Sequence, residues 1–321
     1  MAERVNISDA AVPDTGAVVE VKKPWQISQR TRDNIAGLLF IAPWLIHFFV
    51  LIAGAMIFSF VISLTKTDLL SESSFVGFDN YVKMFDDPLF WKSLRVTAYY
   101  TFVLVPASVI VALAIAMLMN QKVFFLGGWR IIYYLPSVVQ GVAVAILWGY
   151  VLNPRFGLLN QGLSFFGIEG PRWLYSEQWA VPGFILMGVW GAGGAMLLYL
   201  AGLQGVPTAL YEAAEIDGAN FWHRFWHVTI PMLTPTIYFN VLISIIASFQ
   251  VFTQAYIMTS GGPNNATLTQ VLYLYRKGFQ DFQFGYASAL AWALFVIIFI
   301  FAMLVVKSSD AWVHYEGELK R

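Results

Sequence analysis

Residues 286–306 read YASALAWALFVIIFIFAMLVV, a stretch without a single Asp, Glu, Lys, Arg or His. A helix rises 1.5 Å per residue, so about 20 apolar residues are enough to cross the roughly 30 Å of hydrocarbon in a bilayer. The stretch therefore predicts a membrane-spanning helix.

Five further stretches of the same kind precede it. The six predicted spans cover residues 35–63, 96–119, 131–151, 180–203, 229–252 and 286–306, and every Lys, Arg, Asp and Glu lies outside them. We therefore predict an all-α integral membrane protein. Its six-helix transmembrane domain occupies residues 34–306, between a polar and flexible N-terminal tail (1–33) and a C-terminal tail (307–321).

The composition of the 321-residue chain excludes several classes of protein. Hydrophobic residues make up 58% and charged residues only 12%, about half of the ~25% usual in soluble domains. Nineteen basic residues balance nineteen acidic ones, so there is no net basic field to attract nucleic acid. Cysteine is absent, which excludes disulfides, thiolate catalysis and cysteine-ligated metals.

The residues give no sign of an enzyme. The four histidines (47, 223, 227 and 314) lack a cluster of metal-ligating partners in the sequence, and we expect no metal site. The phosphate-binding pattern G-x-x-x-x-G-K-[ST] is also absent, so we do not expect this chain to bind ATP through a P-loop.

The spans are also empty of charged residues, with His47 as their only histidine. Intramembrane carboxylates and bases are the usual parts of proton relays, so a proton-driven pump is disfavoured. Sodium coupling stays open, because backbone carbonyls of broken helices can hold that ion.

The charges between the spans indicate the orientation. Six spans place both termini on one side, and that side would hold 11 Lys and Arg against 8 on the other. The positive-inside rule therefore predicts cytoplasmic termini. Segments 64–95, 152–179 and 253–285 are then long outer loops.

Small polar residues mark a candidate passage for a solute. In the fifth span Asn240, Ser244 and Ser248 are spaced four apart and share one helical face. This face either lines a polar passage or supplies hydrogen bonds between helices. The third span adds Ser137, Gln140 and Gly141, and the fourth adds glycines at 188 and 191, which allow close helix packing or leave room for a solute.

Segment 204–228, QGVPTALYEAAEIDGANFWHRFWHV, predicts two short helices. Alanine, leucine and glutamate favour the first helix, Gly218 ends it, and Asn220 can cap the second. Four aromatic residues of the second helix form a stripe (Phe221, Trp222, Phe225 and Trp226). Such a stripe must be covered by the protein's own spans, by lipid or by another protein.

This segment resembles the EAA loop of permease subunits in binding-protein-dependent ABC importers. The matching residues are Glu212, Ala213, Ala214, Asp217, Gly218, Ala219, Phe225, Val228, Ile230 and Pro231. Three more stretches resemble the carbohydrate and glycerol-phosphate (maltose-type) branch of this family, namely FVGFDNYVKMFDDPLFWKSL (75–94), LNPRFGLLN (152–160) and TSGGPNNATLTQVLYLYRKGFQDFQFGYASALA (259–291). The resemblance extends over nearly everything after residue 33.

The resemblance implies the type I ABC importer permease fold, in a bacterial or archaeal cytoplasmic membrane. The EAA loop would be a cytoplasmic coupling helix, whose residues Glu212, Ala213, Ala214, Asp217, Gly218, Ala219 and Phe225 transmit the action of a separate ATPase. Two ATPase copies would use ATP and Mg, whereas this chain would bind no cofactor. Its other partners would be a second permease, an extracytoplasmic solute-binding protein and membrane lipid.

The resemblance also implies where the solute passes. Positions that match the substrate-contacting faces of maltose-type permeases are Ser137, Gly141, Gly188, Gly191, Ala195, Ser244 and Ser248. We therefore expect a permease subunit that imports a sugar or polyol. The alternative is an ion-gradient-driven secondary transporter or channel for a small neutral solute, but the repeat symmetry typical of such transporters is not evident between residues 1–160 and 161–321.

Overall fold

The computed structural model describes residues 28–68, 73–122, 124–139 and 141–314, which divide into two units after Met56. The first unit is helical: α1 (Gln29–Ile46), the π-helical η1 (His47–Ala53) and the first residues of α2 (Gly54–Ser63). Together Gln29–Ser63 form a 35-residue apolar helix. No residue of α1 or η1 is buried, so lipid or another protein must cover this surface.

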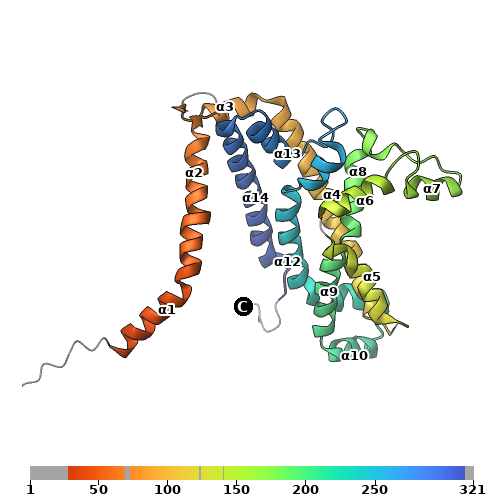
Figure 1. Ribbon diagram of the computed structural model, residues 1–321. Helices are drawn as coiled ribbons and strands as arrows, with labels where there is room; N and C mark the ends of the chain where they lie inside the picture. The colour runs from red at the N-terminus through yellow and green to blue at the C-terminus, as the bar shows by residue number, and fades with distance from the viewer. Residues whose placement is uncertain (1–27, 69–72, 123, 140, 315–321) are drawn as a thin grey trace, which may run out of the picture. The chain divides into compact units, whose positions relative to one another are not determined.

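The second unit holds a short hairpin and the remaining helices (Figure 1). Strands β1 (Thr65–Lys66) and β2 (Ser74–Phe75) pair antiparallel, with Thr65 opposite Phe75. The α-helices are α3 (Asp79–Asp86), α4 (Pro88–Met119), α5 (Leu126–Val138), α6 (Gly141–Val151), α7 (Leu158–Phe165), α8 (Ala180–Trp190), α9 (Gly193–Gly205), α10 (Thr208–Ile216), α11 (Phe221–Arg224), α12 (Ile230–Phe249), α13 (Gln270–Tyr275) and α14 (Phe284–Trp312). The shorter helical turns are η2 (Trp173–Tyr175), η3 (Phe225–Thr229), η4 (Ala255–Thr259) and η5 (Arg276–Gln280).

Among the described residues, four helical segments are long and apolar enough to cross a membrane, and up to six if each of two bent pairs forms one span. The longest in the second unit is α4, with 32 residues or roughly 48 Å. It begins at Pro88, well before the predicted start at residue 96, because Asp87 caps it and Pro88 suits a first helical turn. Helix α14 likewise continues past residue 306 to Trp312.

Two of the predicted spans are not single straight helices. Within 131–151, α5 and α6 meet at 103°, and within 180–203, α8 and α9 meet at 44°. The first bend follows Val139, whose extended backbone ends α5. At the second, the N–H groups of Gly191 and Ala192 bond to carbonyls three residues back, which tightens the last turn of α8.

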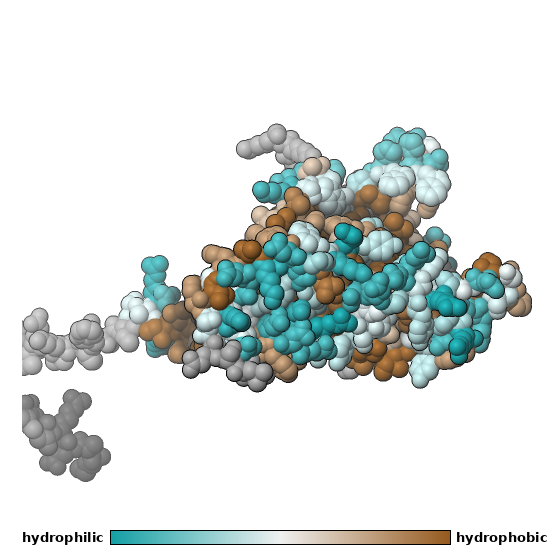
Figure 2. Space-filling view, turned by 90° about the horizontal axis from the view of Figure 1, so that it is seen from above, coloured by the Kyte–Doolittle hydropathy of each residue, from teal (hydrophilic) through white to brown (hydrophobic). Residues whose placement is uncertain are grey.

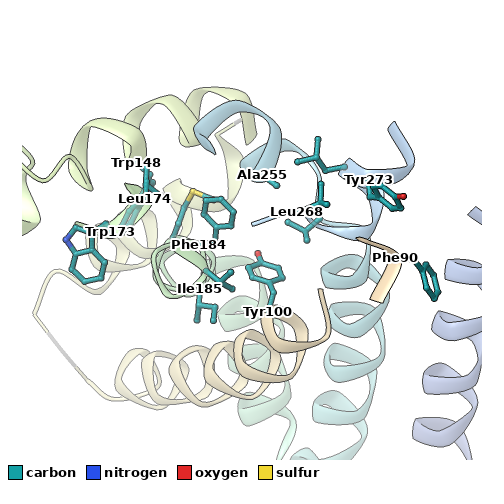
Figure 3. Close-up of a cluster of buried hydrophobic side chains, with 14 of the residues drawn as sticks. Phe90, Tyr100, Trp148, Trp173, Leu174, Phe184, Ile185, Ala255, Leu268 and Tyr273 are labelled. Atoms are coloured by element: carbon teal, nitrogen blue, oxygen red, sulfur yellow. The ribbon is translucent and has the colours of Figure 1, made fainter. Parts of the chain in front are cut away.

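Helix α4 lies at the centre of the packing and contacts α8, α9 and α12. Small residues allow the close approach: Ala112 and Ala116 are fully buried, and a Cβ on Gly188 would lie 2.6 Å from Leu104 of α4. Figure 3 shows Phe90 and Tyr100 of α4 in one cluster with buried side chains of α6, α8 and the 268–273 region.

The second unit has two ends that differ in character. Helices α3, α7 and α13 lie at one end, which we call the α13 end (Figure 1). Helix α10 lies at the opposite end, which we call the α10 end. Figure 2 looks onto the α13 end, where hydrophilic residues gather over the middle of the face. Large apolar side chains are instead exposed along the helices, as at Phe295, Phe299 and Leu304 of α14. This pattern is typical of helices that face lipid.

One carboxylate joins three helices at the α13 end. Asp87 accepts a hydrogen bond from the Leu89 N–H at 2.9 Å, which caps α4. Its other oxygen accepts from the Tyr286 hydroxyl of α14 at 2.6 Å and from the Tyr273 hydroxyl of α13. Burial would raise the pKa of Asp87, but the bonds from Tyr273, Tyr286 and the backbone outweigh it, so this pKa lies below its ordinary value.

We expect Asp87→Ala to lower the free energy of unfolding by about 2–4 kcal/mol, because it removes the helix cap and leaves two buried tyrosine hydroxyls without an acceptor. The measurement is thermal unfolding in detergent, with Asp86→Ala as the control, since the Asp86 side chain is exposed. A carboxylate with a lowered pKa stabilises the fold above its unfolded-state pKa. The difference in the free energy of unfolding between wild type and Asp87→Ala is therefore largest near pH 7 and decreases below about pH 4. Equal unfolding midpoints at pH 7 would contradict the role of this junction.

Candidate functional site

The first candidate site is the loop at the α10 end. Helix α10 ends at Ile216, Asp217 follows as its C-cap, and Gly218 adopts a left-handed conformation with φ +77°. The N–H of Gly218 bonds to the Glu215 carbonyl, and the N–H of Ala219 to the Ala214 carbonyl. Asn220 then caps α11 by accepting from the His223 N–H at 2.9 Å. The predicted helix, glycine turn and asparagine cap are thus confirmed.

Side chains fix the angle between the two short helices of this loop. Arg224 of α11 forms an ion pair with Glu215 of α10. Tyr211 of α10 lies 3.1 Å from the hydroxyl of Thr229, and the two groups share a hydrogen bond. A Cβ at Gly218 would meet no atom within 4 Å, so only the backbone conformation restricts which residue can stand there.

The structure brings all seven predicted coupling residues into this loop. Glu212, Ala213, Asp217 and Gly218 are exposed. Ala214, Asp217, Gly218 and Ala219 line a groove of about 420 Å³ together with residues of α11 and η3. Phe225 instead turns inward and packs against the buried cluster of α4 and α9. One aromatic residue therefore anchors the loop to the bundle, while the face that carries Glu212 remains accessible.

The predicted aromatic stripe is divided by this arrangement. Phe221, Trp222 and Trp226 are 51%, 64% and 60% exposed, so the described residues do not cover them. Ile216, at the end of α10, is 87% exposed. The loop therefore presents apolar and acidic side chains together, a combination that suits contact with another molecule.

The second candidate site is a cavity of about 370 Å³ between α4 and α12. Its lining combines hydroxyl, amide and apolar side chains with no charged group: Tyr100, Leu104, Val105, Ser108, Ser244, Ala247, Ser248, Gln250, Val251, Phe252, Thr253 and Gln254. Two of the predicted passage residues, Ser244 and Ser248, are therefore at the cavity wall. Such a lining can hydrogen-bond a neutral polar molecule.

The other predicted passage residues lie at varying distances from the cavity. Gly141 is close to it, because a Cβ there would be 3.9 Å from Thr253. Gly188 packs against Leu104, which lines the cavity, and Gly191 follows at the end of α8. The remaining residues do not line it: Asn240, Ser137 and Ala195. Gln140 lies outside the described residues.

The hydrogen bonds of the predicted passage residues help to decide whether these residues line a passage or join neighbouring helices. Asn240 donates to the Thr236 carbonyl at 2.9 Å, and Ser248 donates to the Ile245 carbonyl at 3.1 Å. Ser137 donates to the Tyr134 carbonyl, and its side chain lies beside Gly194 of α9. Each of these bonds stays within its own helix. The bonds therefore do not support the interpretation that these residues join helices.

Sequence reasoning missed the contribution of α4 to this cavity. Tyr100, Leu104 and Ser108 are spaced four apart and thus share one face of the helix. Two hydroxyl groups on this otherwise apolar face could have indicated that α4 lines a polar cavity. Across the described ranges, no cluster of three or more His, Cys, Asp or Glu could hold a metal ion.

We expect Ser248→Ala to change the unfolding midpoint little, because its hydroxyl bonds only within α12. The matched control is Ser93→Ala, since the hydroxyl of Ser93 donates from α4 to the buried Gln270 side chain at 2.5 Å. That change should cost about 1–3 kcal/mol. If Ser248→Ala destabilised the protein as much as Ser93→Ala in thermal unfolding, Ser248 would be an interhelical contact and the passage interpretation would fail.

Comparison with known proteins identifies the family of this chain. Residues 100–314 match the model of the binding-protein-dependent transport system inner membrane component. The chain is 40% identical to the probable ABC transporter permease protein YesP of Bacillus subtilis, over 89% of this chain and 94% of that protein. It is 35% identical to the lactose transport system permease protein LacF of Rhizobium radiobacter, over 84% and 93%.

A solved structure has the same fold. A chain of a bacterial alginate ABC transporter, crystallised with a periplasmic protein bound to an alginate pentasaccharide, matches with a TM-score of 0.74 and 24% identity. The match covers 87% of this chain and 96% of that one. The sequence and fold matches agree, and the chain belongs to the inner-membrane permease components of binding-protein-dependent ABC transport systems.

Proposed function

We propose that this permease forms one half of a pore that imports a sugar or a related polyol, delivered by a soluble binding protein. The observation that carries this proposal is the uncharged cavity between α4 and α12, in a chain that belongs to the permease family. The relative LacF is a lactose permease by name. Sugars offer many hydroxyl groups and no charge, and Ser244, Ser248 and Gln254 can hydrogen-bond them.

The shape of the cavity also suits a ring. Tyr100 and Phe252 offer aromatic faces beside the polar groups, and the apolar face of a sugar can pack on such rings. The lining contains no Lys or Arg, which disfavours a phosphorylated solute. In this proposal, a second permease subunit would complete the wall of the cavity.

The energy for import would come from a separate ATPase that this chain contacts through its loop. The accessible face of α10, with Glu212 and Asp217, would dock in a groove of that subunit. Two ATPase copies would bind ATP and Mg, and their closure would move α10 and, through Phe225, the bundle. Residues 204–228 would therefore lie in the cytoplasm.

This orientation puts the α13 end on the outer side of a bacterial or archaeal cytoplasmic membrane. Both termini would lie in the cytoplasm, in agreement with the larger number of basic residues on that side. The alternative, a transporter driven by an ion gradient, requires a charged or ion-binding group within the spans. The absence of Asp, Glu, Lys and Arg from the six predicted spans disfavours a proton gradient, and membership of the ABC permease family favours the ATP-driven mechanism over a sodium gradient.

The test is purification of the tagged chain from native membranes, followed by uptake in proteoliposomes. We expect an ABC ATPase, a second permease and an exported binding protein to copurify. We also expect uptake to require ATP on the side of the membrane where the ATPase lies. Uptake by the chain alone, driven only by an ion gradient, would contradict the proposal.

Gly218 offers a sharper test of the coupling role. We expect Gly218→Val to reduce ATP-driven uptake by roughly 5- to 30-fold, because a left-handed conformation costs a β-branched residue about 1–2 kcal/mol or more. Gly218→Asn should retain most activity, since asparagine tolerates this conformation. The control is Gly205→Val, at a glycine with open surroundings and no positive φ. Wild-type uptake by Gly218→Val, with normal copurification of the ATPase, would exclude the proposed role of the turn.

A further inference from the structure

A second cavity is larger than the α4–α12 cavity and shares no lining residue with it. It has a volume of about 1010 Å³ and lies at the α13 end, between residues 153 and 175. Connecting segments and α7 form its walls, and the long apolar helices do not line it. Its polar side chains include Asn160, Gln161, Ser164 and Glu169.

Two arginines in this pocket have no partner. Arg155 and Arg172 both line it, both are exposed, and neither side chain makes a hydrogen bond or ion pair with any described residue. Arg224, by contrast, pairs with Glu215 at the opposite end. Only Glu169 contributes a negative charge to the lining. The pocket thus holds an excess of positive charge with unused donors.

One amide joins the two backbone segments that carry the arginines. The Asn160 side chain donates to the carbonyls of Pro154 and Pro171, at 3.3 and 3.2 Å. These carbonyls directly precede Arg155 and Arg172 in the chain. The same side chain accepts from the Trp173 indole at 2.6 Å, and Trp173 is buried. Asn160 therefore ties both arginine-bearing segments to the core.

The backbone around the Asn160 side chain allows these hydrogen bonds to form. A Cβ on Gly170 would lie 2.1 Å from the Asn160 side-chain oxygen, so the segment before Arg172 approaches as closely as it does only because residue 170 is glycine. On the other side, Asn153 accepts from the N–H groups of Arg155 and Phe156 at 2.9 and 3.3 Å. Both arginines thus stand on backbone that is already ordered, which reduces the entropy lost on binding.

We propose that this pocket is a docking site for acidic side chains of the exported binding protein. A planar guanidinium group pairs with a carboxylate through two parallel hydrogen bonds, and two such groups in one pocket can take two acidic residues of one surface. Tyr175 and Phe156 border the arginines, and Arg and aromatic residues are enriched at protein interfaces. A volume of about 1010 Å³ accommodates several side chains rather than one ion.

The location favours a protein partner over the solute. The pocket is built from connecting segments at the α13 end, whereas the uncharged α4–α12 cavity lies between long helices of the bundle. This inference rests on the proposed function, because that function places the binding protein at the α13 end. An anionic solute that rests in the pocket is the competing occupant, and the experiment separates the two.

The experiment measures the affinity of the copurifying binding protein for the complete transporter in lipid nanodiscs, without added solute. We expect Arg155→Gln and Arg172→Gln each to raise the dissociation constant roughly tenfold at low salt, and the double variant to lose most of the salt dependence. The control is Lys66→Gln, which removes one exposed positive charge from β1, outside the pocket. Lys66→Gln should bind as wild type does.

Three results would overturn the proposal. The first is wild-type affinity in both arginine variants, each shown to copurify normally with its partner subunits. The second is an equal loss of affinity in Lys66→Gln, which would indicate a general field rather than a site. The third is unchanged binding but reduced solute uptake, which would assign the pocket to an anionic solute. A wild-type transporter that binds no binding protein would instead refute the proposed function itself, before any variant is compared.

A double-mutant cycle then identifies the acidic partner. Neutralising one carboxylate on the binding protein should cost as much as Arg172→Gln or Arg155→Gln, and the two changes together should cost no more than either alone. Additive losses for every exposed carboxylate of the binding protein would mean that no direct pair forms, and would also overturn the proposal.

Discussion

Hydrocarbon offers no hydrogen bonds, and this property of the surrounding lipid constrains the whole chain. The long helices satisfy their backbone groups internally and expose apolar side chains such as Phe299 and Leu304 of α14. Polar side chains gather at three places: the α13 end, the α10 end and the cavity between α4 and α12. Under the proposed function, these places would serve contact with the binding protein, contact with the ATPase and passage of the solute, respectively.

The same constraint explains why, under the proposed function, a separate subunit would supply the energy for transport. The six predicted spans contain no Asp, Glu, Lys or Arg, so they lack the usual parts of a voltage sensor or a proton relay. The bundle can respond to a force applied at one end, provided that the end is stiff. The Glu215–Arg224 ion pair, the Tyr211–Thr229 hydrogen bond and the inward anchor Phe225 supply that stiffness to the loop.

Local features of the sequence predicted much of this arrangement, and contacts between distant residues limited the rest. The turn at Gly218, the cap at Asn220 and the serines at 244 and 248 follow from spacing and from backbone preference. The bends of α5–α6 and α8–α9 do not, because a hydropathy run contains no information about the direction of the helix axis. The position of Arg155 and Arg172 in one pocket is equally hidden, since it depends on one amide that bonds the carbonyls of Pro154 and Pro171, before and after α7.

The carboxylate of Asp87 has a consequence for how the bundle can move. Its two oxygens hold the start of α4, the Tyr273 hydroxyl of α13 and the Tyr286 hydroxyl of α14, and both rings are buried. Separating any one of these helices would strand a buried donor. In a transport cycle of the proposed kind, we therefore expect these three helices to move together. Relative motion would then occur at other contacts, such as that of α8 with α4, where Gly188 has no side chain to interlock with Leu104.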